Sequence, residues 1–198
     1  MIASTPEKRR ALTRRLVVSA MLIAMAFALS YVKIWQMPLG GAVTLCSMLP
    51  ICVISVLYGV RRGLACGFCY SLLQILQSGV FGWGMTPGML AAAILLDYVL
   101  AFSVLGLAGL FRRKGLAGIL CGISLSLFLR FACHFFSGLV LWTKVDAFNA
   151  FGRVFTNTPA LYSLCYNGAF MLPELLFTAA AASLLFSLPQ MKKLIAPE

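Results

Sequence analysis

Long apolar segments, separated by short basic or glycine-rich stretches, make up most of this chain. Of its 198 residues, 62% are hydrophobic and 11% are charged, and the mean hydropathy is +0.97. A soluble domain carries roughly 25% charged residues, and one of this length could not bury so much apolar surface. The sequence therefore predicts an all-α membrane protein, because a helix satisfies its own backbone hydrogen bonds in lipid.

The apolar segments predict a single six-helix transmembrane domain over residues 16–190. A basic cytoplasmic segment at 1–15 precedes it, and a cytoplasmic tail at 191–198 follows it. Each segment is long enough, or nearly so, to cross a bilayer. The expected helices cover residues 16–35, 42–59, 63–79, 87–111, 116–142 and 159–188.

Most of the 16 Lys and Arg residues cluster at one side of this predicted topology. An excess of Lys and Arg marks cytoplasmic loops, so an even number of helices with both termini in the cytoplasm fits the distribution. The +11 net charge does not indicate a nucleic-acid partner, because the basic residues form no contiguous face. The basic clusters are Lys8, Arg9, Arg10, Arg14, Arg15, Arg61, Arg62, Arg112, Arg113, Lys114, Lys192 and Lys193.

The seven cysteines all lie in apolar segments. Their odd number and their apolar surroundings argue against a disulfide framework. The pair Cys66-x-x-Cys69 has no second pair or nearby His to complete a metal site, so we interpret these residues as small core side chains. With one His in the chain, the sequence predicts no metal site and no cofactor.

A few polar side chains interrupt the apolar helices. Asp97, His134 and Asn167 each lie roughly 12–15 Å below the outer end of their helix, so we expect them to converge in the outer half of the bundle. Glu174 lies about two turns deeper than Asn167 on the same helix face. Arg130 precedes His134 by one turn.

Two hypotheses explain these polar residues. In the first, Asp97 or Glu174 pairs with Arg130, and His134 and Asn167 complete an internal hydrogen-bond network. In the second, the groups line a pocket for a small, flat, cationic heterocycle, in which a carboxylate meets the charge and aromatic rings stack on it. The sequence alone leaves both open.

Aromatic and amide side chains around this region have two interpretations as well. Trp35, Trp83 and Trp142 all fall on the outer side, where they form either an interfacial belt or the rim of a pocket. Gln74 either lines the pocket or packs in the core. Ala20, Ala24 and Ala28 repeat every four residues, which permits close approach of another helix, internal or from a partner.

Catalytic and nucleotide-binding motifs are missing from the sequence. It contains no Gly-x-Ser-x-Gly, no His-Glu-x-x-His and no Walker A sequence. A solute carrier without its own ATPase needs ion coupling or a partner that hydrolyses ATP. A membrane enzyme that uses Asp97 and His134 as acid and base remains a distant alternative.

Five segments resemble the thiamine-specific substrate-binding subunits (S-components) of energy-coupling factor transporters. The resemblance runs from the first helix to the sixth, and the order and spacing of the segments make it specific. They are GGAVTLCSMLP at 40–50, YGVRRGLACG at 58–67, LLDYVLAFSVLGLAGLF at 95–111, RFACHFFSGLVLW at 130–142 and YSLCYNGAFMLPE at 162–174.

This resemblance implies a subunit in a prokaryotic cytoplasmic membrane that binds thiamine from outside with high affinity. It implies docking on a transmembrane coupling protein and two ABC-type ATPases, with Ala20 and Ala24 on the docking surface. The ligand-binding residues that it implies are Asp97, Tyr98, His134, Trp142, Tyr162 and Asn167.

The sequence also departs from the family pattern at two positions. Asp97 stands where an acid, commonly Glu, meets the ligand, and its shorter side chain allows a bridging water instead of direct contact. Some relatives carry an acid and a Trp at the start of the second helix, where this chain has Leu45, with Thr44 and Ser47 nearby. We hypothesise that Glu174 supplies the missing carboxylate. The main alternative is the same fold with another vitamin or a thiamine precursor as ligand.

Overall fold

The computed structural model describes residues 6–37, 40–141, 148–150, 153–155 and 158–195. This part of the chain is mostly helical, with two small antiparallel hairpins. The main helices are α1 (Pro6–Ser30), α2 (Leu49–Tyr58), α3 (Val60–Ser78), α4 (Pro87–Ala93), α5 (Ala101–Ser103), α6 (Gly115–Leu141), α7 (Pro159–Ser187) and α8 (Pro189–Ile195). The strands are β1 (Lys33–Gln36), β2 (Ala42–Thr44), β3 (Phe148–Ala150) and β4 (Arg153–Phe155).

The segment from Pro87 to Gly109 is one continuous rod with changing helical geometry. α4 is followed by η3, a π-helix at Ile94–Leu100, then by α5 and by η4, a 3₁₀ helix at Val104–Gly109. π-turns within longer helices are frequent at functional sites. The sequence predicts a helix here but gives no sign of the π-turn, which contains Asp97.

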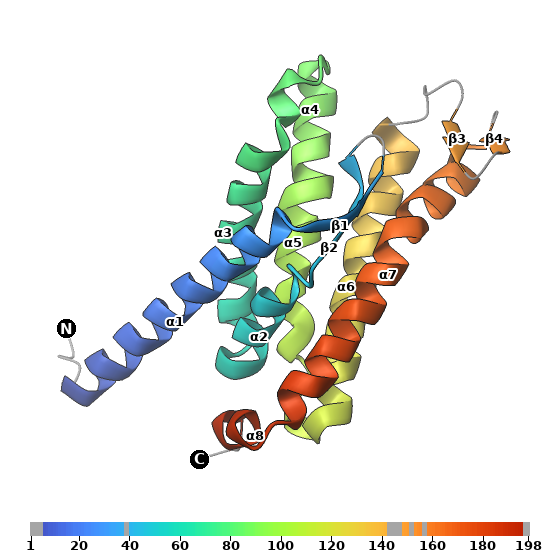
Figure 1. Cartoon of the computed structure of the whole chain (residues 1–198). Helices are drawn as coiled ribbons and strands as arrows, with labels where there is room; N and C mark the ends of the chain where they lie inside the picture. The colour runs from blue at the N-terminus through green and yellow to red at the C-terminus, as the bar shows by residue number, and fades with distance from the viewer. Residues whose placement is uncertain (1–5, 38–39, 142–147, 151–152, 156–157, 196–198) are drawn as a thin grey trace.

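The long helices form a bundle in which α6 packs against α7 and against η4, and α3 packs against η4 (Figure 1). α1 crosses beside the bundle and projects away from it at its N-terminal half, while α8 lies across the end of α7 (Figure 1). Both termini lie at the same end of the molecule, together with the α2–α3 turn. The basic clusters of the sequence therefore gather at one end of the structure.

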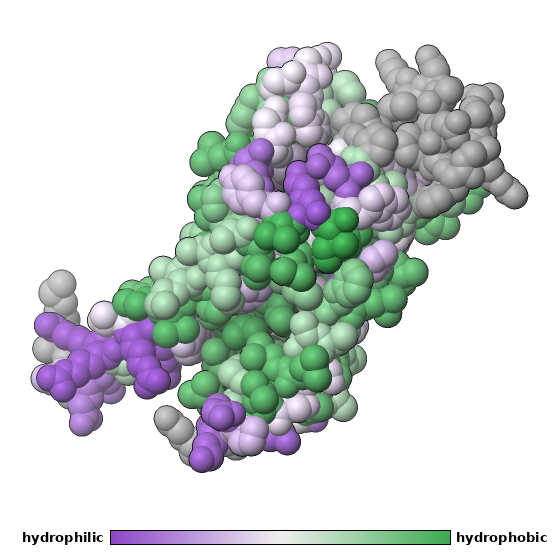
Figure 2. All heavy atoms as spheres, viewed as in Figure 1, coloured by the Kyte–Doolittle hydropathy of each residue, from purple (hydrophilic) through white to green (hydrophobic). Residues whose placement is uncertain are grey.

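Four helical segments are long and apolar enough to cross a membrane, namely Pro6–Ser30, Pro87–Gly109, Arg112–Leu141 and Pro159–Ser187. Large apolar side chains cover the outside of these segments, as the green surface in Figure 2 shows, and Met21, Leu76 and Leu184 are among the most exposed. Such a surface is compatible with lipid rather than water. α2 is apolar but has 10 residues, and α3 is not among the four candidates, so the six-span count stays a prediction.

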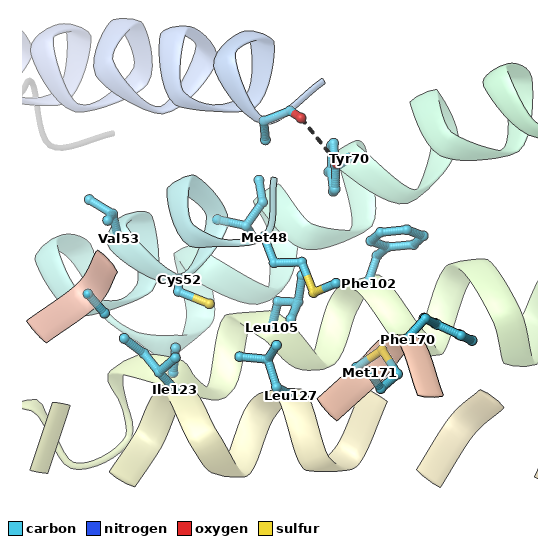
Figure 3. Packing of buried hydrophobic residues seen from close by; sticks show 14 of the residues in the cluster. Met48, Cys52, Val53, Tyr70, Phe102, Leu105, Ile123, Leu127, Phe170 and Met171 are labelled. Carbon is cyan, nitrogen blue, oxygen red and sulfur yellow. Dashed lines mark hydrogen bonds between the residues drawn. The ribbon is translucent and has the colours of Figure 1, made fainter. Parts of the chain in front are cut away.

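The core at the basic end depends on unusually close helix packing. A Cβ atom added to Gly106 in η4 would lie 2.2 Å from the backbone nitrogen of Leu64 in α3, so only glycine permits this contact. Ser55 of α2 donates a hydrogen bond to the Gly106 carbonyl and accepts one from the Gly109 amide. Small residues let helix backbones approach in this way. Figure 3 shows apolar side chains of the core, including Cys52, Leu105 and Ile123.

Several helix limits differ from those expected. The helix expected at 16–35 begins at Pro6 and ends at Ser30, because the Arg- and Lys-rich stretch is itself helical and the apolar residues after Ser30 enter β1. The helix expected at 42–59 begins at Leu49, with Pro50 in its first turn, and ends at Tyr58, just before Gly59, whose φ is 94°. Residues 42–44 instead pair with β1, with Trp35 opposite Val43.

Candidate ligand-binding cavity

A cavity of about 860 Å³ lies inside the bundle, between α3, η3, α6 and α7, with the β1–β2 hairpin over one side. This volume falls within the roughly 300–1,000 Å³ of small-molecule pockets. Tyr70, Phe102, Tyr162, Tyr166 and Phe170 supply aromatic walls. The cavity can therefore hold a drug-sized or vitamin-sized molecule among aromatic rings.

The π-turn of η3 places Asp97 against α6. Nδ1 of His134 lies 2.9 Å from Oδ1 of Asp97, and the Ser137 hydroxyl donates to Oδ2 at 2.5 Å. His134 and Ser137 are three residues apart and so share one face of α6. Because both Asp97 oxygens are engaged, the carboxylate holds the His134 ring in a fixed orientation. Nε2 of His134 has no hydrogen-bond partner among the described residues.

Asn167 ties α7 to α6 beside this pair. Its Nδ2 atom donates to the His134 carbonyl at 3.2 Å and to the Ser163 carbonyl at 3.0 Å. Gly138 permits the approach of the two helices, since an added Cβ would lie 2.1 Å from Oγ of Ser163. The predicted convergence of Asp97, His134 and Asn167 is thus present in the structure, and all three line the cavity.

Three hydrogen bonds join the β1–β2 hairpin to α7. The Gly41 amide donates to the Tyr166 hydroxyl at 3.0 Å. About two turns further along α7, Oε1 of Glu174 accepts from both the amide and the hydroxyl of Thr44, each at 2.6 Å. Ser47 lies 2.7 Å from the same hydroxyl. The hairpin, and with it the cavity wall that it provides, is therefore held by α7.

Glu174 differs from Asp97 in its access to the cavity. Its side chain is completely buried, and Oε2 has no hydrogen-bond partner in the described part of the chain. Pro173 lies directly before it inside α7 without interrupting the helix. Glu174 lines the inner end of the cavity, and its Oε1 atom accepts hydrogen bonds from Thr44 of the β1–β2 hairpin.

The surroundings of Arg130 contradict the ion pair with Asp97 or Glu174 that one of the two sequence hypotheses contained. Within the described residues, neither Asp97 nor Glu174 forms an ion pair with it, and the ion pair of the site joins Asp97 to His134. The guanidinium carbon lies 3.9 Å from the centre of the Phe102 ring instead. The carboxylates are held by closer donors, namely Ser137, His134 and Thr44, and Arg130 is left beside an aromatic face.

The structure gathers most of the residues named from the sequence. Those that line the cavity are Thr44, Gln74, Trp83, Asp97, Tyr98, His134, Tyr162, Asn167 and Glu174. Trp35 does not line it; its side chain is 42% exposed on β1. Trp142 lies outside the described residues. Ala20 and Ala24 are exposed on α1 and do not line the cavity.

Sequence reasoning missed several lining residues, above all Ser137, Tyr166 and Tyr70. The spacing of Ser137 from His134 and of Tyr166 from Tyr162 is typical of one helix face and could have indicated them. Tyr70 lies four residues before Gln74, so the same spacing could have indicated it as well. In the described part of the chain no group of three His, Cys, Asp or Glu residues is placed to hold a metal.

Comparison with known proteins identifies relatives over nearly the whole chain. A family model described as "Thiamine transporter protein" matches residues 16–194. The thiamine transporter ThiT of Bacillus subtilis is 32% identical over 187 residues, which cover 87% of this chain and 90% of that protein. ThiT of Lacticaseibacillus paracasei is 26% identical over 87% of each chain.

A solved structure supports the same fold. ThiT from Listeria monocytogenes superposes with a TM-score of 0.70 and 22% sequence identity, over 96% of this chain and all of that one. At this identity the likeness concerns the fold alone.

Proposed function

The chain belongs to the thiamine transporter protein family, and from this premise we propose that it is the thiamine-binding subunit of an energy-coupling factor vitamin importer. Its relatives are named as transporters and are not enzymes. The Asp97–His134 pair is therefore assigned to ligand binding rather than to acid–base catalysis.

The observation that carries this proposal is a carboxylate–imidazole pair inside an aromatic-walled cavity. Thiamine joins a cationic thiazolium ring to a neutral aminopyrimidine ring. A carboxylate offsets the positive charge, and aromatic faces attract a flat cation through their quadrupoles. Closely spaced aromatic rings are available here, since Tyr162 and Tyr166 stack with centroids 5.8 Å apart and Phe170 lies edge-on to His134.

Each named side chain has a place in this proposal. Asp97 and His134 meet the ligand, Asn167 fixes the backbone beside them, and Tyr98, Tyr162 and Trp142 surround its rings. Trp83, Gln74 and Thr44 complete the lining. Glu174 supports the site through Thr44 and places a second carboxyl group near its inner end. Trp35, exposed on β1, is assigned to the outer rim.

The membrane arrangement belongs to the same proposal. Six spans with both termini in the cytoplasm fit the gathering of basic residues at one end of the molecule, because such clusters remain on the cytoplasmic side. The cavity then opens to the outside of the cytoplasmic membrane. A transmembrane coupling protein and two ABC-type ATPases would supply the energy, with Ala20 and Ala24 of α1 in the docking surface.

The test is a titration of the purified, detergent-solubilised protein with thiamine while intrinsic tryptophan fluorescence is followed. Trp83 lines the cavity, so a bound ligand should quench its emission in a saturable manner. We expect Asp97→Asn and His134→Ala to weaken binding at least tenfold each, because both remove the fixed charge–imidazole pair. Glu7→Gln removes an exposed acid outside the cavity and serves as the matched control.

The outcomes separate the proposal from its closest alternative. Saturable binding of another vitamin or of the pyrimidine precursor, without a response to thiamine, would keep the fold and replace the ligand. No response to any small ligand from folded protein would leave only the internal hydrogen-bond network.

A further inference from the structure

Basic side chains from three elements gather at the end of the bundle where α2 meets α3. They come from the start of α3, from η5, a 3₁₀ helix at Arg112–Lys114, and from α8. α2 brings the three elements together, because α3 follows it directly, Arg112 reaches its last turn and α8 packs against it. The members of this α3–η5–α8 basic cluster are Arg61, Arg62, Arg112, Arg113, Lys114, Lys192 and Lys193.

The fold does not neutralise the positive charge of the basic cluster. The acids of the described residues are Glu7, Asp97 and Glu174, and the last two line the cavity. Within that part of the chain, none of the three forms an ion pair with a member of the cluster. The charge is therefore available to an anion outside the protein.

Some members of the basic cluster have partners inside the fold. Nη1 of Arg112 donates to two carbonyls of α2 at 2.9 and 3.1 Å, and Arg62 and Lys114 lie over the rings of Tyr58 and Phe111. The other members are exposed, and their side chains have no hydrogen-bond or ion-pair partner among the described residues. These are Arg61, Arg113, Lys192 and Lys193.

α8 has the form of a helix that lies at the surface of a membrane. It lies across the end of α7 rather than continuing it (Figure 1). Met191 and Ile195, one turn apart, pack against the apolar core, whereas Lys192 and Lys193 are exposed. A helix with an apolar face and exposed lysines is suited to the boundary between lipid and water.

Exposed apolar side chains adjoin the basic cluster. Leu184 and Leu188 at the end of α7 and Leu110 just before η5 are all exposed. Figure 2 shows the apolar surface changing to a hydrophilic one at the lower end of the molecule, where α8 lies. A partner that fits both surfaces carries an anionic group next to hydrocarbon. A free phosphate or a nucleic acid would leave the apolar part unused.

We propose that the α3–η5–α8 basic cluster binds the headgroup of an anionic phospholipid, whose acyl chains lie along the apolar end of α7. Lys192 and Lys193 contact the headgroup phosphate from α8, and Arg61 and Arg113 complete the site from α3 and η5. The bound lipid fixes α8 at the membrane surface. The inference rests on the membrane arrangement of the proposed function but not on its ligand.

The test compares two lipids that share acyl chains and differ in headgroup charge. Delipidated protein is placed in mixed micelles with equal amounts of phosphatidylglycerol and phosphatidylcholine, and native mass spectrometry counts the lipids retained on the folded chain. We expect the wild type to retain phosphatidylglycerol preferentially. Lys192→Gln combined with Lys193→Gln should lower this preference roughly fivefold or more, because each basic residue near a lipid surface contributes a factor of about five.

A second pair of substitutions and a charge-matched control complete the design. Lys8→Gln combined with Arg10→Gln removes the same charge from the half of α1 that projects away from the bundle (Figure 1), and should leave the preference unchanged. Arg61→Gln combined with Arg113→Gln removes two exposed members of the cluster and should lower the preference as well. This second pair decides the question if the α8 variant does not fold.

Several results would overturn the inference. They are equal retention of both lipids by the wild type, an unchanged preference in the cluster variants, and an equal loss in the α1 control, which would show attraction to net charge alone. Displacement of the lipid by an equal concentration of water-soluble glycerophosphate would also overturn it, because the site would not need acyl chains. Thiamine titration of the same samples is independent: its failure would contradict the proposed function and leave the lipid site standing.

Discussion

Hydrogen bonds fix the side chains of Asp97 and His134 at the cavity and leave Nε2 of His134 without a partner among the described residues. Asp97 uses both oxygens to hold His134 and Ser137, so the imidazole cannot rotate freely and its Nε2 keeps one direction. A preorganised polar group binds a ligand more tightly than a mobile one, because less ordering is needed on binding. Affinity should therefore depend on the residues that hold Asp97 in place.

Ser137→Ala tests this dependence. The change removes a donor to Oδ2 of Asp97 and frees the carboxylate to turn away from His134, so thiamine affinity should fall about tenfold while the protein remains folded. Calorimetric titration measures the affinity, and thermal melting checks the fold. Ser187→Ala is the control, since its hydroxyl bonds the Ser183 carbonyl on the exposed end of α7. Equal affinities for the two variants would show that Asp97 needs no such support.

Among the elements, the β1–β2 hairpin is the part that depends most on its neighbours. It is short, and its contacts to α7 run through the Gly41 amide and through Thr44. A two-stranded hairpin is at best marginally stable alone. Its position over the cavity therefore reflects the fit to α7 more than its own strand pairing.

Gly41→Ala should disturb this fit. The added Cβ would lie 2.9 Å from both the Tyr166 hydroxyl and Cδ1 of Phe170, which pushes the hairpin away from α7. Overpacking of this kind costs roughly 1–3 kcal/mol, so we expect a melting temperature several degrees lower and weaker thiamine binding. Gly88→Ala, where no heavy atom lies within 4 Å, provides the comparison. Identical melting curves for Gly41→Ala and Gly88→Ala would mean that the position of the hairpin against α7 does not depend on Gly41.

These elements also show what the sequence can and cannot predict. The depth of Asp97, His134 and Asn167 follows from a constant rise per residue, so their convergence could be predicted by counting along each helix. The π-turn at Ile94–Leu100 and the strands that replace the expected helix ends depend on contacts with α6 and α7, which no local pattern encodes. One of the two hypotheses left open paired Arg130 with Asp97 or Glu174. Among the described residues this ion pair is absent, because His134, Ser137 and Thr44 hold these carboxylates instead.

At the scale of the whole molecule, the apolar bundle carries its basic residues at one end and its cavity nearer the other. α1 extends beside the bundle, and Met21 and Met25 are exposed on it together with Ala20 and Ala24 (Figure 1). A surface of small and flexible apolar residues permits close contact with another helix. In the proposed function, capture of the vitamin and docking on a coupling module therefore use different parts of the chain.

Ala20→Leu combined with Ala24→Leu should separate these two activities. Thiamine binding by the isolated subunit should not change, because neither residue reaches the cavity, whereas uptake by vesicles containing the coupling module should be largely lost. Ala180→Leu, an exposed alanine on α7, controls for added bulk in the membrane. Normal uptake by the double variant would contradict docking through this face of α1.

The most direct measurement of the central claim is equilibrium binding of radiolabelled thiamine to the purified subunit, with unlabelled thiamine, its pyrimidine half, riboflavin and biotin as competitors. The account predicts one thiamine per chain, displaced by thiamine itself, displaced weakly by the pyrimidine half, and unaffected by the other two vitamins. Bound label that is released by riboflavin or biotin as readily as by thiamine, or no saturable binding by folded protein, would contradict the account.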